Sequence, residues 1–442
     1  RKTTQGLANY IKKQHGESKG VAIAFDSRRM SPEFASEAAL CLAANGIKAY
    51  LFESLRPTPE LSFAVRELGC IAGINITASH NPPEYNGYKV YWEDGAQITP
   101  PHDSGIMGEV QAVTDYNDVL TMDKDEAVKA GLCTMIGKDI DDKYISRLKE
   151  QVKHPEAIQV MGKDLKIVYT PLHGTGNIPA RRILKELGFE NVYVVPEQEL
   201  PDGEFPTVSY PNPEADEAFV LGLKLAKEVD ADLVLATDPD ADRLGVRVKD
   251  KNGEYHNLTG NMSGCLLAEY TISQIKALKG SLPEDGALIK TIVTTNMADA
   301  IAKGYGIRLI ECLTGFKYIG QQILGFETSG KGTYLFGFEE SYGCLIGTHA
   351  RDKDAIVATM ALCEAAAYYK TQGKTLWDAM VDMYDKYGYY KDDVKSISLS
   401  GIEGLAKIQS IMETLRSNPP KEIAGLKVMS ARDYKKDEIV DI

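Results

Sequence analysis

The chain has 442 residues, of which 43% are hydrophobic and 26% are charged, a composition typical of a globular protein of about three domains. Its formal net charge of −13, without a long basic stripe, argues against a nucleic-acid partner. No run approaches the roughly 18 apolar residues of a membrane helix, and the seven cysteines are scattered without a CxxC pair, so we expect a cytoplasmic protein with reduced thiols.

Short apolar runs alternate with helical patterns along most of the chain, beginning with a helix predicted over Arg1–Gln14. We predict strands at Val21–Phe25, Ala49–Phe52, Ile71–Ile76, Lys166–Tyr169, Val192–Val195, Leu233–Ala236, Leu288–Val293, Arg308–Glu311 and Tyr334–Phe338. We predict helices between them at Pro32–Ala44, Ile178–Leu187, Ala215–Glu228, Met262–Ala277, Ala298–Lys303 and Asp354–Tyr369. This alternation favours α/β domains with parallel or mixed sheets, and the order of elements recurs near 20–115, 160–250 and 285–370.

The first polar motif follows the predicted strand Ile71–Ile76 and begins at Thr77. We expect Ser79 to lie on an exposed loop at the carboxyl end of that strand, where α/β sheets bind ligands. A serine hydroxyl needs a base or a metal ion to become a nucleophile. His80 is adjacent in sequence, and Lys89 can return to the loop after an Asn-Gly turn.

The second motif is Asp238-Pro-Asp240-Ala-Asp242-Arg243, directly after an apolar strand. Three carboxylates at this spacing can converge on one cation, and oxygen ligands favour Mg²⁺. An EF-hand loop is excluded because its sixth position holds Arg243 and its twelfth holds Lys249. Arg243 can pair with a phosphate or a carboxylate beside the cluster.

The third motif, Gly337–Gly343, also ends an apolar strand. Glu339 and Ser341 are two residues apart, so both can face the hydroxyls of a sugar. Lys317, next to a turn glycine, is a candidate contact for a phosphate, and Arg351 is a further candidate for substrate binding. Asp352 is expected to cap the helix that follows Arg351.

The composition changes near Tyr389, after which we predict a strand at Lys395–Leu399 and a helix at Gly404–Ser417. The expected domains are therefore 1–140 with the serine loop, 141–255 with the metal loop and 256–385 with the sugar loop. Residues 386–442 are expected to form part of a C-terminal phosphate-binding domain.

Together the three motifs resemble those of the α-D-phosphohexomutase family. The segment Thr77–Lys89 is similar to the phosphoserine loop of that family almost letter for letter, Asp238–Arg243 is similar to its metal loop, and Glu339–Ser341 is similar to its sugar-binding loop. The resemblance covers about residues 1–385. It implies three similar α/β domains with mixed sheets around a central cleft, plus a partial fourth α+β domain.

The resemblance also implies a phosphorylated serine, here Ser79, that binds Mg²⁺ together with the three aspartates. The phosphoserine would transfer its group to a sugar phosphate, and the other phosphate of the resulting bisphosphate would return to the serine. We assign the proton transfer to Lys89 or His80, and we count Arg243 among the catalytic and substrate-binding residues.

The Glu-Glu-Ser sequence of the sugar loop resembles that of the glucose-preferring members. We therefore expect an isomerase that interconverts glucose 1-phosphate and glucose 6-phosphate, with glucose 1,6-bisphosphate as intermediate and activator. Phe338 stands where many hexomutases have glycine, which leaves ribose 1-phosphate open as a substrate. A mannose phosphate substrate and a non-catalytic phosphosugar-binding role are also compatible with these motifs, and the oligomeric state is open between monomer and dimer.

Two segments of the family pattern are missing from this sequence. Family members have a Gly-Thr-x-Gly-x-Arg segment near the start and an Arg-x-Ser-Gly-Thr-Glu-Pro loop near the end, and neither is found between Arg1 and Ile442. We therefore expect both ends of the chain to be cut and the fourth domain to lack its phosphate-binding loop.

Overall fold

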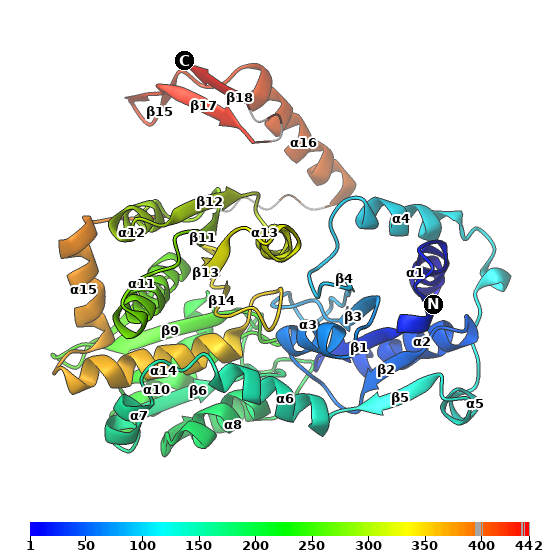
Figure 1. The fold of residues 1–442 in the computed structure, drawn as a ribbon, viewed down its shortest axis with the longest axis horizontal. Coiled ribbons are helices and arrows are strands. Elements are labelled where there is room, and N and C mark those ends of the chain that lie inside the picture. Colours follow the sequence, from blue (N-terminus) through cyan, green and yellow to red (C-terminus); the bar gives the residue numbers. More distant parts are fainter. Residues whose placement is uncertain (394–398, 400, 435, 437, 442) are drawn as a thin grey trace. The chain divides into compact units, whose positions relative to one another are not determined.

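The computed structural model describes residues 1–393, 399, 401–434, 436 and 438–441. It contains two compact units, Arg1–Tyr390 and Lys391–Ile442 (Figure 1). The first unit has three β-sheets, each combined with helices, and each sheet contains both parallel and antiparallel strand pairs. The expected three α/β domains with mixed sheets are therefore confirmed.

The three sheets share one strand order. In each, the first strand in sequence lies between the second and third strands, which run parallel to it, and an antiparallel fourth strand lies beyond the third. An additional edge strand extends the first sheet and another extends the second. The recurrence predicted from the order of elements is thus a repeated topology.

The strands of the first sheet are β1 (Val21–Phe25), β2 (Ala49–Phe52), β3 (Ala72–Ile76), β4 (Tyr88–Trp92) and β5 (Cys133–Ile136). Those of the second are β6 (Lys166–Thr170), β7 (Asn191–Val194), β8 (Leu233–Thr237), β9 (Leu244–Lys249) and β10 (Tyr255–Leu258). Those of the third are β11 (Gly286–Thr291), β12 (Arg308–Cys312), β13 (Thr333–Phe338) and β14 (Cys344–Leu345).

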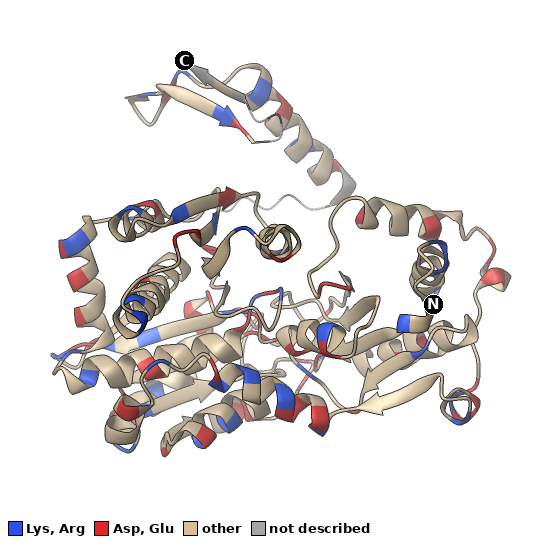
Figure 2. Ribbon diagram, in the orientation of Figure 1, with Lys and Arg blue, Asp and Glu red and all other residues tan. Residues whose placement is uncertain are grey.

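Helices connect the strands and bury them. They are α1 (Lys2–Lys13), α2 (Ser31–Ala44), α3 (Thr58–Glu67), α4 (His102–Ala112), α5 (Lys124–Lys129), α6 (Lys138–Lys149), α7 (Pro155–Met161), α8 (Asn177–Leu187), α9 (Pro196–Glu199), α10 (Val220–Val229), α11 (Gly260–Lys279), α12 (Met297–Tyr305), α13 (Phe316–Ser329), α14 (Ala355–Thr371) and α15 (Leu376–Tyr387). Every residue of β1, β3, β8 and β11 is buried, as expected for apolar strands covered by helices. In Figure 2 the strands are mostly tan, and the charged segments are concentrated on helices and loops.

A single hydrophobic cluster joins the three sheets of the first unit. It includes Ala22 of β1, Leu235 of β8 and Phe336 of β13, none of which is exposed. The loops at the strand ends are therefore held on a common, close-packed scaffold.

The predicted elements of this unit lie within two residues of the observed ones, with two corrections. The helix predicted over Ala215–Glu228 begins with a separate 3₁₀ turn at Asp216–Phe219. The prediction that Asp352 caps the next helix was wrong, because the carboxylate of Asp354 accepts hydrogen bonds from the first-turn N–H groups of α14. Asp352 instead accepts a hydrogen bond of 2.9 Å from the hydroxyl of Tyr91.

The second unit contains α16 (Gly401–Ser417), a short antiparallel pair of β15 (Glu422–Ile423) with β16 (Leu426–Lys427), and another of β17 (Ser430–Asp433) with β18 (Glu438–Asp441). Most of the strand predicted at Lys395–Leu399 lies outside the described residues. Among the helices that are described, none has the length and hydropathy needed to cross a membrane.

Candidate active site

Three loops at equivalent places in the three sheets form the candidate site. Residues 77–87 join β3 to β4, residues 238–243 join β8 to β9, and residues 339–343 join β13 to β14. Each loop connects the third parallel strand of its sheet to the antiparallel fourth strand. The repeated topology therefore explains why all three polar motifs follow an apolar strand.

Ser79 meets the metal loop of the second sheet. Its backbone has a φ of 52°, in the left-handed region, and its N–H donates to Thr77 Oγ1 at 2.9 Å. The Ser79 hydroxyl donates to Asp238 Oδ2 at 2.8 Å, although the two residues are 159 positions apart. Because that bond uses the only hydroxyl hydrogen, the 3.3 Å contact with His80 Nδ1 requires an N–H on the ring.

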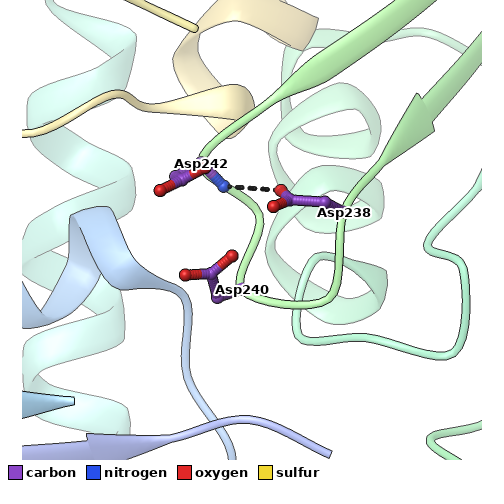
Figure 3. A group of neighbouring side chains, drawn as sticks. All are labelled: Asp238, Asp240 and Asp242. Atoms are coloured by element: carbon purple, nitrogen blue, oxygen red, sulfur yellow. Dashed lines mark hydrogen bonds between the residues drawn. The ribbon is translucent and has the colours of Figure 1, made fainter. Parts of the chain in front are cut away.

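The three aspartates of the metal loop are buried and close together (Figure 3). One ligand atom from each lies within 4.8 Å of the others, and this is the only such group found among the residues that the structure describes. Asp238 Oδ1 accepts the backbone N–H groups of Asp242 and Arg243 at 3.1 and 3.0 Å. The Oδ1 atoms of Asp240 and Asp242 have no hydrogen-bond partner within the described chain.

Two lysines, one in β4 and one in the segment before α14, hold the Oδ2 atoms of Asp240 and Asp242. Lys89 Nζ lies 2.8 Å from Asp240 Oδ2, and Lys353 Nζ lies 3.0 Å from Asp242 Oδ2. Each carboxylate thus has one oxygen fixed by the protein; the other oxygen accepts from Ser79 in Asp238 and has no hydrogen-bond partner among the described residues in Asp240 and Asp242. Three buried carboxylate oxygens and a serine oxygen form the hard donor set that fits Mg²⁺.

Burial and mutual repulsion perturb the ionisation of the cluster. Burial, followed by the charge of Asp240, raises the pKa of Asp238 well above its ordinary value. Burial would also raise the pKa of Asp240, but the charge of Lys89 and several hydrogen bonds outweigh it and lower that pKa. A cation bound at this place would relieve the repulsion.

The two predicted proton-transfer residues have different charge states. Burial, followed by the charge of Arg243, lowers the pKa of His80 to about 3, so its ring is neutral near pH 7. Burial would lower the pKa of Lys89, but Asp240 and Asp242 outweigh it and raise that pKa, so Lys89 carries its proton. The hydroxyl proton of Ser79 is directed to an aspartate rather than to either of these two side chains.

The two glutamates of the sugar loop, Glu339 and Glu340, accept hydrogen bonds from different segments of the chain. Glu339 Oε1 accepts the N–H of Gly315 at 3.1 Å, and Ser341 is half-buried. The Arg243 guanidinium donates to Glu214 at 2.7 Å. The neighbouring Glu340 instead accepts, at Oε2, the hydroxyls of Thr291 at the end of β11 and of Thr294 just after it, at 3.0 and 3.2 Å.

Arg351 and Lys317 were both predicted to contact substrate. Neither forms a hydrogen bond with the aspartates in the part of the chain that the structure describes. Arg351 is fully buried and donates to the carbonyls of Thr348 and Ala350 and to Glu327. Lys317 lines a separate cavity of about 410 Å³.

Sequence reasoning missed three residues that organise the loops. Arg28, after β1, donates from a buried guanidinium to backbone carbonyls of the serine loop. Thr58, at the start of α3, and Lys353 contact the metal loop. Lys353 could have been found beside Arg351, but Thr58 has no local signal because its partner is 182 positions away.

Comparison with known proteins gives consistent results along the first unit. Residues 1–117, 142–253 and 259–387 match the models of phosphoglucomutase/phosphomannomutase alpha/beta/alpha domains I, II and III, respectively. The phosphoglucomutase of Staphylococcus aureus strain N315 is 38% identical over 439 residues, which are 99% of this chain and 77% of that protein. The phosphoglucomutase of Staphylococcus epidermidis strain ATCC 12228 is 36% identical over 441 residues, or 100% of this chain and 78% of that protein.

A solved structure shares the fold. The open form of the exocytosis-sensitive phosphoprotein pp63/parafusin, a phosphoglucomutase from Paramecium, superimposes with a TM-score of 0.70 at 20% identity, covering 100% of this chain and 80% of that one. At this level of identity the likeness concerns the architecture.

Proposed function

Because this chain belongs to the phosphoglucomutase/phosphomannomutase family, we propose that it interconverts glucose 1-phosphate and glucose 6-phosphate through a phosphorylated Ser79. The observation that carries the proposal is the 2.8 Å bond from the Ser79 hydroxyl to Asp238, a member of the buried acidic cluster. A nucleophilic serine against a cation site is what phosphoryl transfer requires.

The proposed reaction has two transfers. In the first, a sugar hydroxyl attacks the phosphorus of phosphoserine 79, the bond from Oγ to phosphorus breaks, and the proton of the sugar hydroxyl ends on Oγ. In the second, Oγ attacks the other phosphate of glucose 1,6-bisphosphate, the bond from that phosphorus to the sugar oxygen breaks, and the proton of Oγ ends on the released sugar oxygen, which regenerates the phosphoserine. When bound by Ser79, Asp238, Asp240 and Asp242, Mg²⁺ would offset the charge of the transferring group.

The surrounding side chains have proposed roles that follow from their positions. Lys89 and Arg243 bring positive charge to the aspartates of the metal loop, which Ser79 contacts through Asp238. His80 is the neutral hydrogen-bond partner of Oγ, and a proton leaving the serine would move toward Asp238. Glu339 and Ser341 would bind sugar hydroxyls.

Phe338 gives no reason to prefer a pentose over a hexose as the substrate. Its side chain is fully buried and packs against Phe336 with the ring centroids 5.8 Å apart. A ring that lies in the core leaves the space over the sugar loop unchanged, so the replacement of glycine gives no reason to favour ribose 1-phosphate.

Labelling tests the proposal directly. The chain is incubated with Mg²⁺ and glucose 1,6-bisphosphate that carries labelled phosphate, and one label is expected on Ser79. Ser79→Ala should take up none, whereas Ser62→Ala, a buried serine that bonds the Gly95 carbonyl, should be labelled like the wild type. A wild-type chain without label, or equal label in Ser79→Ala, would contradict the proposal. Relative turnover of glucose 1-phosphate, mannose 1-phosphate and ribose 1-phosphate then tests the sugar preference.

A further inference from the structure

We propose that Thr58 selects the cation of the site by restricting Asp240 to one ligand oxygen, so that Mg²⁺ is preferred over Ca²⁺. This inference rests on the metal site of the proposed function. Thr58 is fully buried, and it acts as a positioning residue through Asp240.

Thr58 holds Asp240 at two points. It is the first residue of α3 and is completely buried. Its backbone N–H donates to the carbonyl oxygen of Asp240 at 2.9 Å, and its hydroxyl donates to Asp240 Oδ2 at 2.8 Å. The N–H groups of a first helical turn have no partner within the helix, so α3 uses one of them to fix the metal loop.

Asn75 fixes the direction of the Thr58 hydroxyl. Its side-chain nitrogen lies 2.7 Å from Thr58 Oγ1, and Asn75 is itself buried within β3. An ionised Asp240 can only accept, so Thr58 must donate to it and must accept from the amide of Asn75. The three side chains form a relay with a single orientation, in which the hydroxyl cannot turn away from Asp240.

The relay leaves Asp240 with one usable ligand atom. Oδ2 receives both the Thr58 hydroxyl and, at 2.8 Å, the ammonium of Lys89, whereas Oδ1 has no hydrogen-bond partner anywhere in the described residues. Bidentate binding would need both oxygens, and so Asp240 is limited to monodentate binding. Mg²⁺ requires a compact octahedral shell, but Ca²⁺ accepts more oxygens and commonly takes bidentate carboxylates.

The test is to measure Mg²⁺ and Ca²⁺ binding by isothermal titration calorimetry with the full chain. Thr58→Val removes the hydroxyl and keeps the shape, and we expect the Kd for Mg²⁺ to rise about tenfold, as is typical when a residue behind a metal ligand is lost. The Kd for Ca²⁺ should change much less, because Oδ2 of Asp240 then keeps only the ammonium of Lys89 as a partner and can turn toward the larger ion. Thr58→Ser keeps the hydroxyl and should restore the preference.

Ser62→Ala is the matched control, because Ser62 is a buried hydroxyl on the same helix that donates to the Gly95 carbonyl at 2.6 Å and accepts the N–H of Arg351 at 2.8 Å, neither of which belongs to the metal loop. It should leave the ratio of the two Kd values unchanged. Circular dichroism reports folding, and if Thr58→Val fails to fold, Asn75→Ala, which frees the hydroxyl to rotate, should lower the Mg²⁺ preference in its place.

Three results would overturn the inference. Thr58→Val could weaken both ions by the same factor, it could change nothing, or Ser62→Ala could shift the preference equally. These results leave the proposed function standing as long as the wild type binds Mg²⁺. A wild-type chain that binds neither ion would remove the proposed metal site together with the inference.

Discussion

Replacing Arg28 with methionine should destabilise the first domain strongly and in a pH-dependent way. The Arg28 guanidinium is fully buried and donates to the carbonyl oxygens of Ser79, Pro82 and Tyr85 at 2.7, 2.8 and 2.9 Å. Its Nε lies 3.3 Å from Asp26 Oδ2, and the Asp26 side chain is also fully buried. Methionine keeps the apolar part of the side chain and removes every one of these interactions.

The expected loss follows from the buried charge that is left behind. Removing one partner of a buried ion pair costs about 3–5 kcal/mol. The donated hydrogen bonds belong to the same guanidinium and are not counted again. We therefore expect the free energy of unfolding to fall by about 4 kcal/mol at pH 8, where Asp26 is ionised.

The loss should shrink at low pH. Burial raises the pKa of Asp26 from 3.8 to about 6 in the folded protein. A carboxyl group with a raised folded pKa contributes stability that is complete below about pH 4 and is lost as the pH rises through about 6. Without Arg28 the pKa of Asp26 rises further, so at pH 5 the carboxyl group is protonated and no bare charge remains.

Urea unfolding at pH 8 and pH 5, followed by the fluorescence of buried Trp92, measures both effects. Arg29→Met is the control, because Arg29 is exposed and pairs with an exposed Glu204, so its loss should stay below about 1 kcal/mol. A loss for Arg28→Met below about 1 kcal/mol, or the same loss at both pH values, would refute the reasoning.

Three further outcomes are expected. Mg²⁺ at about 100 times its Kd should stabilise the wild type by about 2.7 kcal/mol in thermal unfolding, and Asp242→Asn should lose most of that gain; an equal gain would place the ion elsewhere. Lys353→Met should destabilise the metal-free chain by about 3 kcal/mol and the Mg²⁺-bound chain by less, since the ion supplies the missing charge; equal losses would contradict this. Gly260→Ala should cost about 1–3 kcal/mol and disturb the sugar loop, because its Cβ would lie 2.0 Å from the carbonyl oxygen of Glu340, whereas Gly108→Ala, with nothing within 4 Å, should not destabilise the chain.

The sequence predicted features that depend on short stretches of chain. Apolar runs such as Leu233–Ala236 identify buried strands, and polar motifs directly after them identify the loops, because the signal lies within about ten residues. Helix starts are less certain, since Asp352 and Asp354 are both good capping residues and only the path of the backbone decides between them.

Other features depend on which distant residues meet. Lys353 and Thr58 contact the metal loop only because the sheets pack together, and neither has a motif of its own. In a strand that is buried on both faces, such as β13, hydrophobicity does not tell which face a side chain takes. The inward position of Phe338 therefore had to come from the structure.

The ion pair of Lys89 with Asp240 also has a consequence for synthesis on the ribosome. The two residues are 151 positions apart, which at typical rates of about 5–20 residues per second means that the aspartate is made about 8–30 s after the lysine. During that interval the nascent first domain exposes a cation at the edge of its sheet. The opposite charges of Lys89 and Asp240 then guide its docking with the second domain. The ion pair forms only when the two domains have docked.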